Sequence, residues 1–154
     1  VANEWDAPVR FDRIEKLLAA QNIHSVASFK AIQRDVVDGY AVEALPLLLA
    51  QTKPSSERAS AALTLLKGWD GAMQMDKPQP LIFAAWMRQF MKQLMADEMK
   101  DAFTLVWNYW PEFSIRVLTN QNGVARWCDD ISTTDKVESC HEQLASSLDV
   151  ALKA

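Results

Sequence analysis

Hydrophobic residues recur at the spacing of a helix along most of this chain. Near the beginning, Ile14, Leu17 and Leu18 fall three and four positions apart. They follow Pro8, a residue suited to the start of a helix because the first amide groups of a helix need no internal partner. The pattern predicts a helix over residues 9–20.

A second apolar face predicts one long helix that begins after Ser25 and continues to Gln51. Charged residues lie elsewhere on the helical wheel, as an amphipathic helix requires. A kink is expected near Gly39 and Pro46, because both residue types disturb helical backbone. The apolar face consists of Phe29, Ile32, Val36 and Tyr40.

The polar segment 52–56 contains a proline and predicts a connector whose serines can cap a third helix. That helix is expected to end at about Trp69, before an Asp-Gly turn. The two prolines of segment 77–80 argue against regular helix at their positions. Residues 70–80 are therefore expected to form an irregular loop.

The next helix has the clearest pattern in the sequence. Apolar residues stack four positions apart, with charged and amide side chains around them. This arrangement predicts an amphipathic helix of about four turns. The stacked residues are Ile82, Trp86, Phe90 and Leu94.

The last third of the chain is less regular. Residues 103–113 are rich in aromatic side chains, and both helix and irregular structure are compatible with them. A short helix is expected over 114–119, before the turn sequence at 120–123. Thr134 or Asp135 is expected to cap a long closing helix. Its inward face would hold Val137, His141, Leu144, Leu148 and Leu152.

Strand patterns are missing from the sequence: no segment alternates convincingly with a period of two, and no repeat of fixed length occurs. We therefore expect an all-α fold, an irregular multi-helix assembly in which residues 1–154 form a single helical region. The first residues, 1–6, and the last, 150–154, carry neither a cap nor a stop signal. On that pattern the chain is expected to be a fragment of a larger protein.

Composition supports a globular region and excludes two classes of partner. Of the 154 residues, 49% are hydrophobic and only 4 are glycine, which argues against disorder and against a turn-rich β sandwich. The net charge is -4 and no basic stripe occurs, so nucleic acid is not an expected partner. The longest apolar run, residues 44–50, is far shorter than the ~20 residues that span a bilayer, so no membrane partner is expected.

The residues alone do not predict an active site. Neither a G-x-S-x-G nor an H-E-x-x-H motif occurs. The acidic pairs at 97–98 and 129–130 could suggest acid-base chemistry or calcium, but such pairs are typical of solvated groups near helix ends. His24 and His141 have ordinary structural places available. Neither a metal nor a cofactor is expected in this chain.

Cys128 and Cys140 are twelve positions apart, too far for the C-x-x-C spacing of a redox or zinc site. A local disulfide between them would close a loop that the loop-entropy model values at ~3 kcal/mol. Two free thiols are the alternative. A disulfide would place the maturation of the protein in an oxidising compartment such as a periplasm.

The aromatic residues allow two interpretations. They can line an apolar ligand pocket, or they can fill a core that has few other large side chains, which is the favoured interpretation. The set consists of Trp69, Trp86, Trp107, Tyr109, Trp110 and Trp127.

Three segments between residues 5 and 95 follow an order and spacing shared with one enzyme family. They are residues 5–18, with Trp5 and Arg10; residues 29–48, with Ile32-Gln33-x-Asp35; and residues 63–86, with Trp69-Asp70-Gly71. Together they resemble the β-subunit of the penicillin acylase (penicillin amidase) family, whose members are N-terminal nucleophile hydrolases.

The resemblance implies a larger parent enzyme. Family members are heterodimers matured by self-cleavage, in which the new N-terminal Ser of the β-subunit attacks an amide and its α-amino group is the general base. Backbone donors and an Asn side chain hold the oxyanion. Both the Ser and the Asn lie upstream of the region seen here. This chain alone is therefore expected to lack the nucleophile and to be inactive.

The resemblance also implies a structural context. The helical region would be attached to an αββα catalytic core, with the rest of the β-subunit and the α-subunit as partners. The substrate would be a small-molecule amide of the penicillin, cephalosporin or acyl-homoserine lactone type. The calcium ligands of the family do not map onto residues here. The expected location is periplasmic or secreted.

One functional position carries over from the resemblance. Arg10 matches an active-site arginine of related acylases, where a fixed guanidinium can orient the amide or a carboxylate. The alternative is an ordinary arginine at a helix N-terminus, with Arg13 as a nearby competitor for the match. Trp69, Asp70 and Gly71 are expected to be a structural signature that shapes a turn, without a catalytic role.

Two other functions are compatible with the sequence. The first is a free-standing secreted helical binding module with a tryptophan-lined apolar cleft. The second is a secreted helical bundle that serves as an assembly partner. The fragment interpretation makes a different prediction: surfaces that face the missing parts of the enzyme should be apolar and exposed.

Overall fold

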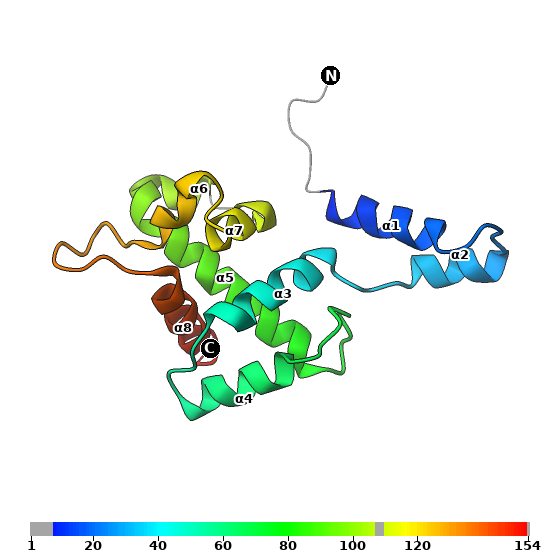
Figure 1. Ribbon diagram of the computed structural model, residues 1–154, viewed down its shortest axis with the longest axis horizontal. Coiled ribbons are helices and arrows are strands. Elements are labelled where there is room, and N and C mark those ends of the chain that lie inside the picture. Colours follow the sequence, from blue (N-terminus) through cyan, green and yellow to red (C-terminus); the bar gives the residue numbers. More distant parts are fainter. Residues whose placement is uncertain (1–7, 107–109, 154) are drawn as a thin grey trace, which may run out of the picture.

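Every regular element in the described part of the chain is helical (Figure 1). The computed structural model describes residues 8–106 and 110–153. Within those residues one isolated antiparallel bridge joins Val37 to Ala72, and no strand is present. The expected all-α fold is confirmed. In chain order the elements are α1 (Val9–Ala19), α2 (Val26–Gln33), α3 (Gly39–Gln51), α4 (Glu57–Leu66), α5 (Pro78–Met99), the 3-10 helix η1 (Lys100–Ala102), α6 (Phe103–Val106), α7 (Pro111–Leu118), the 3-10 helix η2 (Gln121–Cys128) and α8 (Cys140–Ala151).

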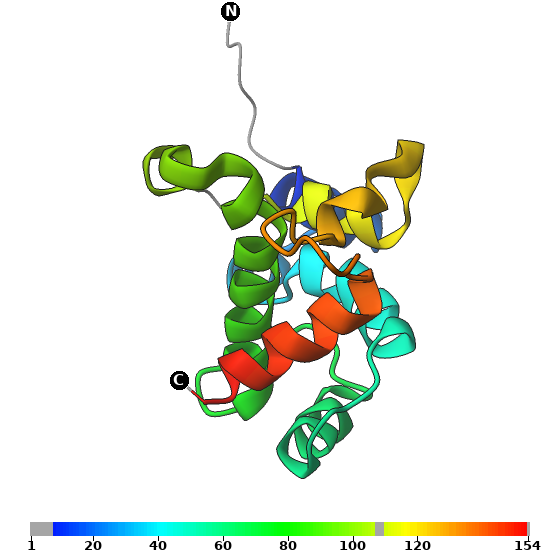
Figure 2. The same ribbon diagram turned by 90° about the vertical axis from the view of Figure 1, so that its left-hand side faces the viewer.

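The core is built around α5. Buried side chains recur three and four positions apart along this helix, so a broad apolar face is covered. Helix α8 crosses α5, as Figure 2 shows, and its Leu144 and Leu148 are fully buried in the same core. The buried residues of α5 are Phe83, Trp86, Met87, Phe90, Met91, Leu94 and Met95.

Helix α5 begins at Pro78, within the segment expected to be an irregular loop, so that prediction was wrong. The first amide groups of a helix have no partner inside it, and Pro78 and Pro80 therefore cost no hydrogen bond in the first turn. The helix has 22 residues, about six turns rather than the expected four. No described helix, α5 included, is long and apolar enough to cross a membrane.

The long helix expected after Ser25 is two helices, α2 and α3, so that prediction was also wrong. Between them, segment 36–38 pairs with segment 71–73, where the amide of Met73 donates to the carbonyl of Val36 at 2.9 Å. A helical backbone would use that carbonyl internally. The contact with a distant loop therefore ends α2 and restarts the helix at α3.

The connector before α4 forms as expected, with Ser56 as the N-cap; its side chain accepts a hydrogen bond from the amide of Ala59 at 3.1 Å. Helix α4 ends at Leu66 rather than at about Trp69. Gly68, with a φ of 77°, takes the left-handed conformation that often follows a helix.

The closing helix α8 begins at Cys140, several residues after the expected caps Thr134 and Asp135, so that boundary was wrong. Ser139 is the N-cap. Its side chain accepts from the amide of Glu142, and the Glu142 carboxylate accepts from the amide of Ser139. Ser139 and Glu142 therefore form a capping box about one turn after the caps expected from the sequence.

The region before η2 settles an open question from the sequence. Helices α6 and α7 show that parts of 103–113 are helical, while 107–109 lies outside the described residues. Helix α7 begins before the expected start of the 114–119 helix. The expected turn is confirmed by left-handed backbone at Asn120, Asn122 and Gly123.

Helices α1 and α2 form a hairpin at one side of the molecule, away from α5 and α8 (Figure 1). Neither helix has a buried residue. Phe11 is 66% exposed and Ile23 is 88% exposed. The large apolar side chains of this hairpin are therefore mostly not covered by other described residues. The exposed large apolar residues of 9–36 are Phe11, Leu18, Ile23, Val26, Phe29 and Val36.

Candidate functional site

Arg10 lies in the first turn of α1, beside an ion pair that joins α1 to the segment after α2. In this pair the Arg13 guanidinium makes a bidentate hydrogen-bonded contact with the Asp35 carboxylate: Nε donates to Oδ1 at 2.9 Å, and Nη2 donates to Oδ2 at 2.6 Å. The side chains are 22% and 14% exposed. Arg13, which the sequence offered only as a competitor for Arg10, therefore has a definite structural partner.

Arg10 makes a weaker, one-sided contact with the same aspartate. Its Nη1 donates to the backbone carbonyl of Asp35 at 3.3 Å and lies 3.7 Å from the carboxylate Oδ1. The Arg10 side chain is 52% exposed. No other hydrogen bond or ion pair joins it to the described residues, so most of its guanidinium is free to meet a ligand.

The arginines keep Asp35 ionised. Hydrogen bonds from Arg13 are the main cause that lowers the pKa of the Asp35 carboxyl, helped by the Val37 amide and by the charge of Arg10, while desolvation opposes them. The same pairing raises the pKa of Arg13. Arg10, Arg13 and Asp35 together carry one net positive charge, and Arg10 is the most exposed of the three side chains. The cluster is suited to a carbonyl or carboxylate oxygen.

A groove of about 280 Å³ lies between α1, α3 and α7. Arg13 forms part of its wall, but Arg10 does not line it. Its lining includes no Ser, Thr, Cys or His, so it brings no nucleophile or imidazole base to Arg10. The charged residues that share the wall with Arg13 are Asp12, Lys16, Glu43 and Glu112.

The sequence Trp69-Asp70-Gly71 forms a tight turn whose donors and acceptors are satisfied locally. The Asp70 Oδ1 accepts from the amide of Ala72 at 3.0 Å, and the Trp69 indole nitrogen donates to the carbonyl of Ala72 at 3.1 Å. The carbonyl of Gly71 accepts from the amide of Asp38 at 2.9 Å. The turn holds the loop against the segment between α2 and α3.

Replacing Gly71 by alanine is expected to lower the free energy of unfolding by about 2 kcal/mol, from left-handed backbone strain and crowding. Gly71 has a φ of 80°, and an added Cβ would lie 2.9 Å from the Val42 side chain and 3.2 Å from the Asp38 carbonyl. Gly68→Ala is the matched control: its φ is 77°, and nothing lies within 4 Å of an added Cβ. Urea unfolding of both variants measures the difference. Equal losses would contradict the close approach at Gly71.

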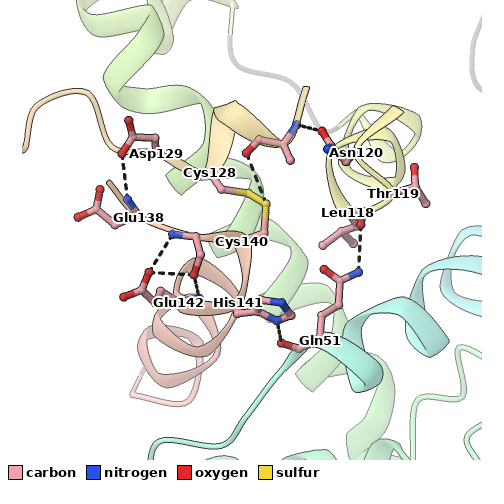
Figure 3. Close-up of a disulfide and its surroundings, with 12 residues drawn as sticks. Gln51, Leu118, Thr119, Asn120, Cys128, Asp129, Glu138, Cys140, His141 and Glu142 are labelled. Carbon is pink, nitrogen blue, oxygen red and sulfur yellow. Dashed lines mark hydrogen bonds between the residues drawn. A yellow bond between two sulfur atoms is a disulfide. The ribbon is translucent and has the colours of Figure 1, made fainter. Parts of the chain in front are cut away.

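Cys128 and Cys140 form a disulfide in the structure (Figure 3). Cys128 is the last residue of η2 and is 1% exposed, and Cys140 is the first residue of α8. Their Cα atoms are 4.9 Å apart. The disulfide interpretation of the two cysteines, rather than two free thiols, is the one that the structure contains.

The loop closed by this disulfide is held by carboxylates that accept backbone hydrogen bonds. Asp129 accepts from the amide of Glu138 at 2.9 Å, and Asp97 of α5 accepts from the amide of Ile131 at 2.8 Å. Asp130 accepts from its own turn. Three of the four acids in these pairs, Asp97, Asp129 and Asp130, therefore stabilise the local fold. In the described part of the chain, no group of three or more His, Cys, Asp or Glu side chains is arranged to hold a metal ion.

Comparison with known families defines the relationship of this chain. The profile of the family described as penicillin amidase matches residues 1–154. The chain belongs to the penicillin amidase family. No curated protein and no solved structure matches it. The family resemblance drawn from the sequence is therefore confirmed, and the chain is related to acylase-type hydrolases.

Both histidines of this chain have structural contacts. His24 lies between α1 and α2, where one ring nitrogen is 2.9 Å from the carbonyl of Leu18. His141 lies 2.5 Å from the carbonyl of Gln51 through Nδ1. Its side chain is exposed, so the expected inward orientation was wrong, because α8 begins later than predicted. Neither histidine contacts the Arg10 cluster.

The described tryptophans of this chain mostly pack in the body of the fold. Trp86 is fully buried, Trp69 lies 5.5 Å from the ring of Phe83, and the ring of Trp127 lies edge-on to that of Phe113. Trp110 is 50% exposed, while Trp107 and Tyr109 lie outside the described residues. These positions agree with the core interpretation of the described aromatic residues.

Acidification is expected to weaken the start of α8 through Glu142. The backbone amide of Ser139, the Lys136 ammonium and the Ser139 hydroxyl lower the pKa of Glu142 from 4.5 to about 2. A lowered pKa means that the carboxylate stabilises the fold above pH 4.5 and loses this effect as the pH falls towards 2. The thermal midpoint of Glu142→Gln should lie below that of the parent at pH 7, and the gap should narrow below pH 4.5.

The exposed Glu98→Gln variant is the control for this prediction, since the structure shows no capping contact for Glu98 among the described residues. A gap between the Glu142→Gln variant and the parent that stays constant from pH 7 to about pH 2 would contradict the role of the carboxylate.

The sequence missed the partnership of Arg13 with Asp35. A signal was present, because Asp35 ends the Ile32-Gln33-x-Asp35 motif used to recognise the family. No local rule connects this aspartate to an arginine 22 positions earlier. Only the turn between α1 and α2 brings them together.

Proposed function

We propose that this chain is the helical part of the β-subunit of a penicillin amidase-type enzyme, which hydrolyses a linear amide with an N-terminal Ser outside the chain. The family match over residues 1–154 is the observation that carries the proposal. The described side chains agree with it: both cysteines are in the disulfide, and both histidines contact backbone carbonyls. On this proposal the chain alone is inactive.

The exposed apolar face of α1 and α2 supports the proposal that other parts of the enzyme cover this hairpin. Helices with large apolar side chains and no buried residue are unusual on a free-standing surface. The rest of the β-subunit and the α-subunit are the proposed partners, together with the αββα core.

Arg10 is the residue of this chain that we place next to the substrate. Its exposed guanidinium offers donors to a carbonyl or carboxylate oxygen, and Asp35 holds it at one end. The substrate is a small-molecule amide of the penicillin, cephalosporin or acyl-homoserine lactone type. The disulfide between Cys128 and Cys140 supports a periplasmic or secreted enzyme, because such bonds persist in oxidising compartments.

The test uses the product of the complete gene that encodes this chain. Its intact mass and N-terminal sequences are measured, and the same sample is assayed with p-nitroanilides of aromatic, dicarboxylic and fatty acyl groups. We expect two chains, one beginning with Ser, and hydrolysis of at least one anilide. Arg10→Gln should lower kcat/KM by about a hundredfold, the size of a lost oxyanion-type donor.

A stable product of 17.4 kDa without amide hydrolysis would contradict the proposal. That outcome would favour the free-standing binding module, for which exposed Trp110 is the one described tryptophan at least half exposed. A defined oligomer of the same product would favour an assembly partner instead.

A further inference from the structure

The contacts of Asp35 are divided unequally between two arginines. Arg13 takes both carboxylate oxygens, through Nε at 2.9 Å and Nη2 at 2.6 Å. Arg10 is left with the backbone carbonyl at 3.3 Å and a distant approach of 3.7 Å to Oδ1. The planar fork of an arginine matches a carboxylate best when two parallel bonds form. Only Arg13 has that arrangement.

This division has a consequence for Arg10. An arginine so close to a free carboxylate would turn to form its own fork with it, and its donors would then be used up. Because Arg13 fills both oxygens, Arg10 is held through Nη1 alone, with Nε and Nη2 unused by the described residues. Its exposed fraction of 52%, against 22% for Arg13, reflects the same division.

We propose that Arg13 and Asp35 are positioning residues for Arg10: the Arg13–Asp35 fork fixes one end of the Arg10 guanidinium and prevents Asp35 from capturing the rest. The inference rests on the proposed function, in which Arg10 meets the substrate. The backbone carbonyl of Asp35 holds Nη1 of Arg10. Arg13 occupies both carboxylate oxygens, so the carboxylate does not bind the rest of the Arg10 guanidinium. The free edge of Arg10 then points a preset pair of donors at a carbonyl or carboxylate oxygen of the substrate.

The proposal predicts that two single variants lose activity for different reasons, both through the orientation of Arg10. Asp35→Asn keeps the backbone carbonyl that accepts from Arg10 Nη1, but it removes the carboxylate charge and the bidentate bond to Arg13 that fixes this segment, so Arg10 loses part of its orientation. Arg13→Gln frees the carboxylate, so Asp35 captures Arg10. In the double variant no carboxylate is present to bind the whole Arg10 guanidinium, so part of the activity lost by Arg13→Gln should return. A merely structural role of the fork predicts that the double variant is no better than either single one.

The first readout is direct and does not depend on catalysis. In the 154-residue chain, the arginine Nε–Hε signals are recorded by NMR with ¹⁵N-labelled protein. Arg13→Gln should move the Arg10 signal towards the position that Arg13 has in the parent, and should slow its hydrogen exchange. Asp35→Asn should move it towards the signal of a free arginine. Arg10 signals that stay unchanged in both variants would overturn the proposal.

The second readout is the hydrolysis of the acyl p-nitroanilide preferred by the complete enzyme. Arg13→Gln should lower kcat/KM by about a hundredfold, the effect of misplacing a substrate-binding group by about 1 Å. Asp35→Asn should lower it by only about tenfold, because the backbone carbonyl that holds Nη1 is retained. Glu15→Gln, an exposed acid on α1 outside the cluster, is the matched control for the change of charge. Arg13→Gln and Asp35→Asn break the same half-buried ion pair, so their thermal midpoints should fall by similar, small amounts, while Glu15→Gln should leave the midpoint unchanged.

The failure of this inference and the failure of the proposed function are distinguishable. If Arg10→Gln lowers kcat/KM but Asp35→Asn and Arg13→Gln leave it unchanged, only the positioning roles are overturned. If Arg10→Gln has no effect on an active enzyme, the proposed place of Arg10 at the substrate falls, and the positioning roles fall with it. Recovery of activity in the double variant, together with the NMR shifts, supports both.

Discussion

Replacing Trp86 by alanine is expected to lower the free energy of unfolding by about 3–5 kcal/mol. Trp86 is 0% exposed in the middle of α5, and it also makes polar contacts with α8. Its indole nitrogen donates to the carbonyl of Leu144 at 3.0 Å and lies 3.2 Å from the Ser147 hydroxyl oxygen. The substitution removes a large buried ring and the donor that joins the two central helices. Urea unfolding followed by far-UV circular dichroism measures the loss.

Two further variants separate the contributions of packing and hydrogen bonding. Trp86→Phe keeps most of the ring but removes the donor, so a smaller loss of about 1–2 kcal/mol is expected. Leu81→Ala changes the same helix at a side chain that is 75% exposed, and it should alter stability by no more than about 0.5 kcal/mol. A loss at Trp86 no larger than the loss at Leu81 would contradict the position of Trp86 in the core.

Removing the disulfide is expected to lower the free energy of unfolding by about 3 kcal/mol. The bond between Cys128 and Cys140 closes a loop with a sequence separation of 12, and it ties the end of η2 to the first residue of α8. In the variant Cys128→Ala with Cys140→Ala, the unfolded chain gains the conformations that the loop excludes. Urea unfolding of the variant and of the oxidised parent measures the difference.

Chemical reduction supplies the control for the disulfide. A phosphine reductant should lower the stability of the parent towards that of the double alanine variant, while leaving the variant itself unchanged. The slope of free energy against urea should also rise without the bond, because the unfolded state becomes more extended. A parent whose unfolding midpoint is insensitive to reduction would contradict a stabilising bond.

The helices that the sequence predicted best are those whose apolar residues recur over several turns. For α5 the pattern of Trp86, Phe90 and Leu94 predicted the buried face, and all three residues are fully buried. For α1 the pattern predicted the helix almost to the residue, although none of its residues is buried. Helical hydrogen bonds join residues four positions apart, so the information that specifies them is local.

The helix boundaries that were wrong have causes far away in the sequence. Helix α2 ends at Gln33, just before segment 36–38 pairs with segment 71–73, a contact between residues too far apart for any local sequence pattern to predict. Helix α8 begins at Cys140 because Ser139 and Glu142 cap it there, rather than the expected caps Thr134 and Asp135, five and four residues before Ser139. Before α8, Asp97 accepts a hydrogen bond from the amide of Ile131, and Asp129 accepts one from the amide of Glu138. These contacts hold the loop that precedes the helix.

By itself, the sequence determined the all-α class, the family relationship and the places of most helices. The family match confirms the relationship, and the described helices confirm the fold class. These properties follow from residue spacing along the chain, since helix periodicity and motif order are both one-dimensional.

Only the tertiary structure decided which arginine pairs with Asp35 and which stays exposed. Arg10 and Arg13 lie one helical turn apart on α1, and both are cations at the same end of the same helix. Their separation into a half-buried bidentate pair and an exposed guanidinium depends on how the α1–α2 hairpin presents the carboxylate. A carboxylate has room for one two-pronged partner, and the geometry of the turn, rather than the composition of the helix, selects it.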